Sequence, residues 1–437
     1  MKNQGDRTWL SATLGLAALF LLGSAAPARA GTDDTNSTEV VVAGGSDSAP
    51  SEGAGAEAAP EPKPRMDIYG FAMLDVGYDF KQVDPNWFDV LRPTKLPSRP
   101  DQFGADGNFY AGVRQSRLGV KGYLPTNLGE IKTIFEFELF GTGVDAGQTT
   151  FRLRHAWGEI GQFGAGQTWS PFMDPDVFPN SIEYWGPNGM VFFRNVQVRW
   201  MPMQGENELF FALERPGASA DQGTYADKIA LQNVKAHFPA PDFSLHYKRS
   251  GDWGHVQIAA IYRYISWKDT VPDDIDASGH ANGWGVNLST NIKTPMKGTV
   301  RASVIYGEGV ENYMNDAPVD IGVETNAPDP HRPLLGKALP VFGAVGFYDF
   351  NWNEHFSSAL GYSYLHITNS NGQAPDAFKT GQYALANLLY YPVNNVMAGF
   401  EFQWGHRENF SDGFKVPDYR LQFSAKFNFN FHLEKKS

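Results

Sequence analysis

Basic side chains recur at alternate positions of short stretches whose other positions are apolar. In Thr150 to Trp157, Arg152 and Arg154 alternate with Phe151 and Leu153. A guanidinium group binds a carboxylate through two parallel hydrogen bonds, so a row of such groups beside water would attract small anions. The early stretches together supply such a row: Arg117, Lys121, Arg152, Arg154 and Arg199.

Acidic side chains share the same faces and leave a second interpretation open. Glu136 and Glu138 fall on the polar face of Ile131 to Phe140, and Asp75 and Asp79 occur in an earlier stretch. The arginines could pair with these acids and only keep the wall rigid, or they could also select anions. The same alternation turns the later basic residues Lys248, Arg263, Arg301 and Arg420 toward the polar side.

Arg114 and Arg194 break this alternation, because each shares a face with apolar neighbours. We expect them at a bulge, at the end of a loop or at a subunit interface. Trp157 belongs to the apolar face with Phe151 and Leu153, and His155 shares that face. His155 is therefore expected at a rim or an interface.

The elements that must position these groups are strands. Tyr419 to Phe431 alternates an apolar, largely aromatic face with a polar one, and mean hydropathy is -0.36 although 14% of residues are aromatic. A polar face repeated along many strands needs water inside and lipid outside. A basic residue facing lipid near the bilayer midplane would cost ~2 to 4 kcal/mol, which favours the inward assignment.

Connections between the strands alternate between short and long. The short ones are 125–128, 161–162, 202–207, 250–253, 294–297, 351–354 and 392–394, and the long ones are 81–106, 141–148, 169–189, 216–242, 268–279, 308–338, 368–377 and 406–417. The pattern predicts an all-β fold, a transmembrane antiparallel β-barrel of about sixteen strands. Short periplasmic turns and long extracellular loops would join them.

Residues 1–30 read as a cleaved secretory signal, because the apolar run Leu14 to Leu22 follows Lys2 and Arg7 and precedes a small-residue site ending at Ala30. Residues 31–65, rich in Ala, Gly, Pro and acids, are expected to be a disordered periplasmic linker before a barrel over 66–437. The chain has no cysteine, which excludes disulfides and thiolate metal sites, and we expect no cofactor or metal. A net charge of -12 argues against nucleic acid as a partner.

Two blocks resemble the DcaP-like trimeric porins of Gram-negative outer membranes. They are RQSRLGVKG from Arg114 to Gly122 and TFRLRHAWGEIGQFGAGQTWSPF from Thr150 to Phe172. The resemblance implies a sixteen-stranded homotrimeric channel in outer-membrane lipid for small anionic solutes such as dicarboxylates, with 169–189 folded inward as a constriction. The arginines that match those of the family are Arg114, Arg117, Arg152, Arg154 and Arg194. Residues 31–65 lack the heptads of the family's coiled-coil segment, so any trimer would be held by the barrels.

The function expected is passive, anion-preferring diffusion, and two other classes stay open. A barrel hydrolase needs a Ser/His/acid set, for which the ten histidines show no spacing. A surface receptor or adhesin would use the long loops, above all 308–338. Asp273, Asp274 and Asp276 could hold Ca²⁺ in such a loop, although acidic loops are more often simply solvated.

Overall fold

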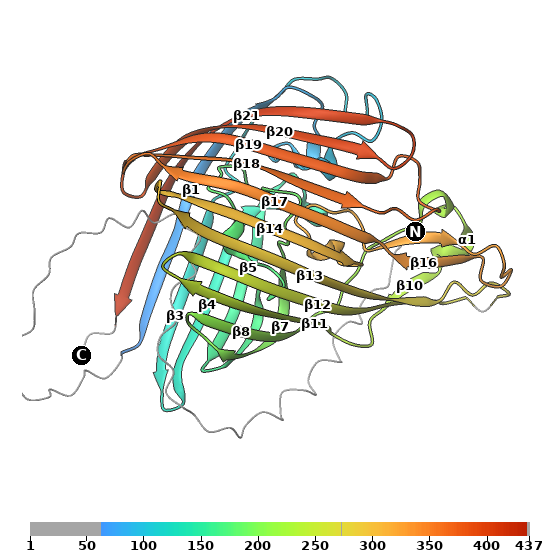
Figure 1. Ribbon diagram of the computed structural model, residues 1–437, viewed down its shortest axis with the longest axis horizontal. Coiled ribbons are helices and arrows are strands. Elements are labelled where there is room, and N and C mark those ends of the chain that lie inside the picture. Colours follow the sequence, from blue (N-terminus) through green and yellow to red (C-terminus); the bar gives the residue numbers. More distant parts are fainter. Residues whose placement is uncertain (1–62, 272, 435–437) are drawn as a thin grey trace, which may run out of the picture.

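A closed antiparallel barrel dominates the computed structural model, which describes residues 63–271 and 273–434 (Figure 1). The signal segment, most of 31–65 and the last three residues lie outside the described residues. Among those that are described, no helix is both long and apolar enough to cross a membrane.

Sixteen strands form the barrel, as the alternation predicted. The first eight are β1 (Arg65–Asp79), β3 (Arg117–Thr126), β4 (Gly129–Phe140), β5 (Thr149–Ile160), β6 (Phe163–Trp169), β7 (Arg194–Met203), β8 (Asn207–Glu214) and β11 (Asp242–Gly251). The others are β12 (Gly254–Asp269), β13 (Gly279–Thr294), β14 (Gly298–Glu308), β17 (Pro340–Asn351), β18 (Phe356–Ile367), β19 (Phe378–Val393), β20 (Val396–Asn409) and β21 (Lys415–Glu434). Each pairs with the next, and β1 closes the barrel on β21 from Arg65↔Glu434 to Asp79↔Arg420.

Two short strands extend the wall at the long-loop end. β2 (Asn108–Gly112) pairs with β1 beyond β3, and β10 (Val234–His237) pairs with β12 beyond β11. A separate small sheet of β9 (Ala220–Asp221), β15 (Ile321–Thr325) and β16 (Leu334–Ala338) lies in the loops, near the one-turn helix α1 (Ile229–Gln232). The remaining elements are 3-10 turns: η1 (Pro85–Trp87), η2 (Pro93–Lys95), η3 (Gly143–Asp145), η4 (Pro175–Val177), η5 (Gly223–Tyr225) and η6 (Glu311–Tyr313).

Short turns join the strands at one end of the barrel and long loops at the other, as the sequence predicted (Figure 1). The turn residues Gly161, Lys297 and Asn395 have φ values of 56°, 57° and 69°, in the left-handed region that tight reversals require. Along the strands, apolar side chains such as Phe151 and Phe400 are exposed on the outside. Polar side chains alternate with them on the inner face.

Loop segments fill much of the interior and supply the core. Residues 170–193 pack Phe172 and Val191 against inward side chains of β12, β14 and β17, including Ile261 and Ile305. Residues 84–96 add Leu91 to a second cluster. Residues 309–320 add Val310, Tyr313 and Met314 to the first. The sequence predicted only the first of these segments to fold inward. The other two are findings of the structure.

Candidate functional site

A group of arginines and glutamates on β3, β4, β5 and β7 gathers on the inner wall. Glu138 lies 2.7 Å from Arg154, 3.5 Å from Arg117, 3.6 Å from Arg152 and 3.7 Å from Arg194, measured between side-chain oxygen and nitrogen atoms. Glu136 lies 2.5 Å from Arg154 and 3.7 Å from Arg117. We call these residues the Arg–Glu cluster: Arg117, Arg152, Arg154, Arg194, Glu136 and Glu138.

A β-bulge in β5 makes this convergence possible. Glu136 of β4 pairs with His155, but the next residue, Phe137, pairs with Leu153, so Arg154 has no partner of its own. The extra residue lets Arg154 and His155 both turn inward, and it inverts the faces of the residues that follow. Placing Trp157 outside and His155 at a rim was therefore wrong, because both are buried on the inner side.

Two aromatic side chains close the Arg–Glu cluster on its loop side. Arg194 lies over the ring of Trp169 at 4.7 Å, and Arg154 lies over the same ring at 5.5 Å. The Tyr184 hydroxyl donates to Glu138 and accepts from Arg152 at 3.3 Å. Sequence reasoning missed Tyr184, whereas Trp169 falls in the family block GQTWSPF.

The Arg–Glu cluster keeps an excess of positive charge. Four guanidinium groups face two carboxylates, a net charge of plus two, with Arg152 30% and Arg117 19% exposed. The buried atoms Arg117 Nε and Arg194 Nη1 have no hydrogen-bond partner among the described residues. Because these two atoms are buried, a solute in the pore would meet the exposed parts of Arg152 and Arg117 instead.

Arg199 and Lys121 lie on the same inner wall but outside this cluster. Arg199 stacks on Trp157 at 5.0 Å and donates to the carbonyl of Trp169. Lys121 lies 5.4 Å from the ring of Tyr69, whose hydroxyl donates to Glu136 at 2.7 Å. Tyr69 therefore links the lysine to the cluster.

The remaining predicted basic residues hold loops and wall together elsewhere. Arg263 pairs with Asp242 at 3.0 Å and with Asp320 at 2.7 Å. Arg301 pairs with Asp349 at 2.5 Å and donates to the carbonyl of Asp176 in the inward segment. Arg420 pairs with Asp79 at 2.6 Å and donates to the carbonyl of Phe88 in a loop. Among the described residues, these arginines all have carboxylate partners.

Arg114 lies in the interruption between β2 and β3, a loop-end position that accounts for its broken alternation. It is 1% exposed, pairs with Asp89 at 2.5 Å and donates to the carbonyls of Gly141 and Gln148. Arg194 is the first residue of β7, directly after the inward segment 170–193, so it too lies at a loop end. Its side chain nevertheless reaches into the Arg–Glu cluster.

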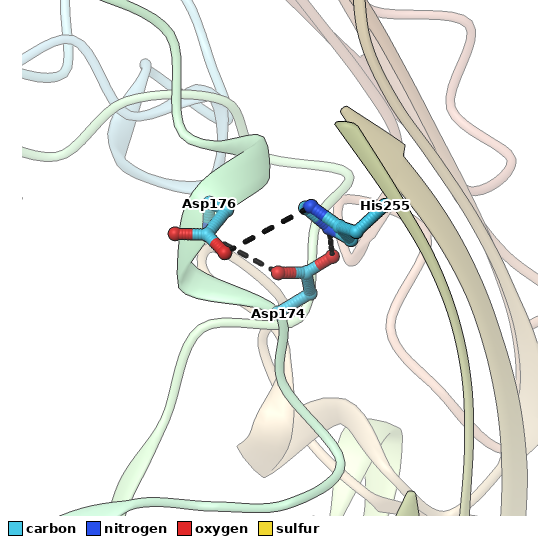
Figure 2. A group of neighbouring side chains, drawn as sticks. All are labelled: Asp174, Asp176 and His255. Atoms are coloured by element: carbon cyan, nitrogen blue, oxygen red, sulfur yellow. Dashed lines mark hydrogen bonds and ion pairs between the residues drawn. The ribbon is translucent and has the colours of Figure 1, made fainter. Parts of the chain in front are cut away.

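A second polar group anchors the segment 170–193 to the opposite wall (Figure 2). Asp174 Oδ2 accepts from His255 Nε2 at 2.7 Å and from Ser289 Oγ at 2.6 Å. Asp176 accepts from Lys248 Nζ at 2.6 Å. Burial opposes ionisation of Asp174, but the hydrogen bond and charge of His255, with Lys248, lower its pKa to about 2.

Asp174, Asp176 and His255 offer metal-type ligand atoms within 4.8 Å of one another. The protein already balances their charge, since Lys248 pairs with Asp176 and the His255 Nε2 atom is committed to Asp174. A divalent cation would have to displace both contacts. The arrangement works as an ion-paired anchor, and we call it the loop anchor: Asp174, Asp176, Lys248, His255 and Ser289.

Glu183 attaches the other part of the inward segment and makes that attachment sensitive to pH. Its carboxylate accepts from the backbone N–H groups of Leu91 and Gly186, with Glu401 and Arg420 nearby. Burial, opposed by the Gly186 hydrogen bond and Arg420 and assisted by Glu401, raises the Glu183 pKa from 4.5 to about 7. Because the folded-state pKa is the higher one, protonation stabilises the attachment, and this stability is lost as pH rises through about 7.

We therefore expect amide hydrogen exchange in 182–186 to be faster at pH 8 than at pH 5.5, after correction for the intrinsic pH dependence of exchange. Glu183→Gln should remove this pH dependence because no proton can then be released at the site. A variant that keeps the full pH dependence would assign it to another group. Exchange in β1 serves as the internal control.

Comparisons with known proteins agree with this architecture. Residues 61–429 match the family model described as DcaP outer membrane protein. None of the curated proteins matches the chain.

Solved structures share the fold. The outer membrane channel DcaP of Acinetobacter baumannii is similar with a TM-score of 0.68 and 21% identity, over 84% of this chain and 98% of that one. An anion-selective porin from Comamonas acidovorans has a TM-score of 0.54 and 10% identity, over 84% and 100%. The trimer form of OmpT from Vibrio cholerae has a TM-score of 0.52 and 12% identity, over 84% and 100%. The chain belongs to the DcaP outer membrane protein family, whose relatives here are channels rather than enzymes, and its place is the bacterial outer membrane.

Proposed function

We propose that this porin conducts small anions by passive diffusion, with a preference for dicarboxylates, and that the Arg–Glu cluster binds the passing solute. The observation that carries the proposal is the excess of two positive charges on the wall facing the inward segment. Fixed charge beside a narrow aqueous path enriches ions of the opposite sign. No cofactor or energy source is required for such diffusion.

The internal acids tune the strength of solute binding. Arg154 is held by Glu136 and Glu138 and is nearly buried, so it serves as a fixed support. Arg117 and Arg152 make longer contacts and keep exposed surface. Conduction requires binding that is strong enough to admit the solute and weak enough to release it. Partial neutralisation by the glutamates suits this requirement.

A solute with two carboxylates gains most from this arrangement. One carboxylate can contact Arg152 while the other reaches Arg117, and the two side chains come from different strands, β5 and β3. Arg199, with Lys121, extends the basic wall beyond the cluster. The similar porin from Comamonas acidovorans is anion-selective, which supports the preference for anions but not the choice of dicarboxylates.

The proposal also assigns the constriction to the inward segment 169–189 and the assembled state to a homotrimer. Asp174 holds that segment against β12 and β13, and Glu183 holds it to Leu91 of segment 84–96. The trimer form of the similar OmpT structure supports the assembly. Without heptads in 31–65, the barrels themselves would make the trimer contacts, and the mass of the detergent-solubilised complex tests this assignment.

The salt-gradient reversal potential of the purified protein in planar bilayers tests the proposal. In a tenfold KCl gradient we expect the sign of an anion-preferring pore, with a smaller magnitude at higher mean salt because the charges are screened. Succinate should reduce chloride current at lower concentrations than acetate does. A cation-preferring sign would refute the anion assignment, whereas equal effects of succinate and acetate would refute only the dicarboxylate preference.

A further inference from the structure

Lys426 is an inward-facing cation of β21 that the sequence-based site prediction did not include. Even-numbered residues of β21 point inward: Arg420 and Ser424 are completely buried, while the intervening Leu421 is 46% exposed on the outside. Lys426 continues this inner face but is only half-buried, and Asn430 beyond it is exposed. Lys426 therefore lies where the packed part of the interior ends along this strand.

The inward segment 170–193 lies on the long-loop side of Lys426. β21 begins at the long loop 406–417 and runs toward the short-turn end of the barrel. Gln422 Nε2 donates to the carbonyl of Ile182 in the inward segment at 3.0 Å. Lys426 follows Gln422 by four positions, which places it roughly 13 Å closer to the short-turn end. A solute that has passed the inward segment from outside would meet Lys426 next on this wall.

The ring of Phe71 lies between Lys426 and Arg117 of the Arg–Glu cluster. Lys426 Nζ is 4.4 Å from the ring centroid, and the guanidinium carbon of Arg117 is 5.2 Å from it. Phe71 belongs to β1, which pairs with β21 on one side and with β3 on the other, where Arg117 is its direct partner. Two cations from different strands thus flank one apolar ring on the inner wall.

Acids on this part of the wall are bonded to other residues. Asp75 accepts from Ser424 Oγ at 2.5 Å, and Asp67 pairs with His432 at 2.7 Å. Within residues 63–271 and 273–434, no carboxylate lies within ion-pair distance of the Lys426 ammonium group, whose printed contact is the Phe71 ring. An ammonium group beside apolar side chains attracts an anion more strongly than one in bulk water, because the surroundings screen its charge less.

We propose that Lys426, Phe71 and Arg117 form a second solute-binding position for small dicarboxylate anions, on the periplasmic side of the inward segment. One carboxylate contacts Lys426, the other contacts Arg117, and the hydrocarbon part of the solute lies against Phe71. This position rests on the proposed function and extends it. Arg117 belongs to both positions, so the solute can exchange Arg152 for Lys426 while one carboxylate stays bound. Short steps between adjacent binding positions permit both entry and release.

Since the chain has no cysteine, the charge at position 426 can be changed within one open channel. Lys426→Cys removes the charge. Aminoethyl methanethiosulfonate then restores an ammonium group, whereas methyl methanethiosulfonate adds a neutral group. We expect the succinate concentration that halves the chloride current to rise at least about threefold in Lys426→Cys, because one charge-assisted contact is lost. The aminoethyl reagent should return this concentration to the parent value, and the methyl reagent should not.

Lys268→Cys is the matched control, because it removes the same charge from outside the lumen. Lys268 is exposed on the outer face of β12, five positions after the inward-facing Arg263. Neither this substitution nor either reagent should change the block by succinate. Because each reagent acts on a channel that is already conducting, a change on its addition cannot come from misfolding.

The possible results separate the second position from the proposed function. An anion-preferring parent that is blocked by succinate, with the same half-blocking concentration in Lys426→Cys, would overturn the second position alone. Failure of the aminoethyl reagent to react would also overturn it, because residue 426 would then not face the solute path. Equal recovery with both reagents would assign the effect to side-chain volume and overturn the charge contact. A cation-preferring parent would instead refute the proposed function, and the second position with it.

Discussion

Replacing Arg117 and Arg152 together by glutamine is expected to remove most of the anion preference. The change takes the Arg–Glu cluster from a net charge of plus two to zero, while Arg154 still holds Glu136 at 2.5 Å and Glu138 at 2.7 Å. At an effective dielectric of tens, two charges a few ångströms from the solute contribute on the order of 1 to 2 kcal/mol. The anion-to-cation permeability ratio should therefore fall about tenfold.

The measurement is the reversal potential of single channels in a salt gradient. The pair Lys235→Gln and Lys268→Gln is the matched control, because it removes the same charge from the outer wall. Conductance of the arginine variant should stay within about twofold of the parent, because Arg154 and its ion pairs with Glu136 and Glu138 are retained. If the reversal potential is unchanged while the control also has no effect, the Arg–Glu cluster does not select the ion.

Much of the fold follows from local sequence because a barrel wall imposes a period of two on every strand. The alternation in Tyr419 to Phe431 corresponds to β21, and the proline, glycine and asparagine turns fall where the strands reverse. Such patterns depend only on neighbouring residues and on the contrast between lipid and water. For this reason the strand count and the alternation of short and long connections were predictable.

The interior was less predictable, because its geometry depends on contacts between distant residues. A single extra residue at Arg154 turns His155 and Trp157 inward, and strict alternation cannot show where a strand gains a residue. Arg263 and Arg301 obey the alternation, yet their partners Asp320 and Asp349 lie in other parts of the chain. Residue type alone cannot separate an arginine that anchors a loop from one that meets the solute.

The sequence of 84–96 contains a signal for its inward fold, which its interpretation as an ordinary long loop did not use. Trp87, Val90, Leu91 and Leu96 are apolar residues in a long connection, and all are buried in the structure. Arg92 stacks between Trp87 at 4.1 Å and Trp185 at 3.9 Å and pairs with Asp316 at 2.9 Å. These contacts join all three inward segments. Apolar residues clustered in a loop are a usable signal, although they do not reveal the partner segments.

The second large effect is expected from Asp174→Ala, which removes the centre of the loop anchor. Asp174 is completely buried, and its loss leaves His255 and Ser289 without their shared acceptor. Each buried group left without a partner costs about 1 to 3 kcal/mol, so the segment 170–193 should detach locally from β12 and β13. If that segment constricts the pore, single-channel conductance should rise severalfold and open-channel noise should increase.

Asp274→Ala is the control for this change, because it removes an acid from an exposed extracellular loop without touching the anchor. The control should keep the parent conductance and the parent noise. The barrel closes through β1 and β21 without the anchor, so both variants should retain their strand content. An Asp174→Ala channel with lowered thermal stability but unchanged conductance would show that 170–193 supports the wall and that the constriction lies in 84–96 or 309–320 instead.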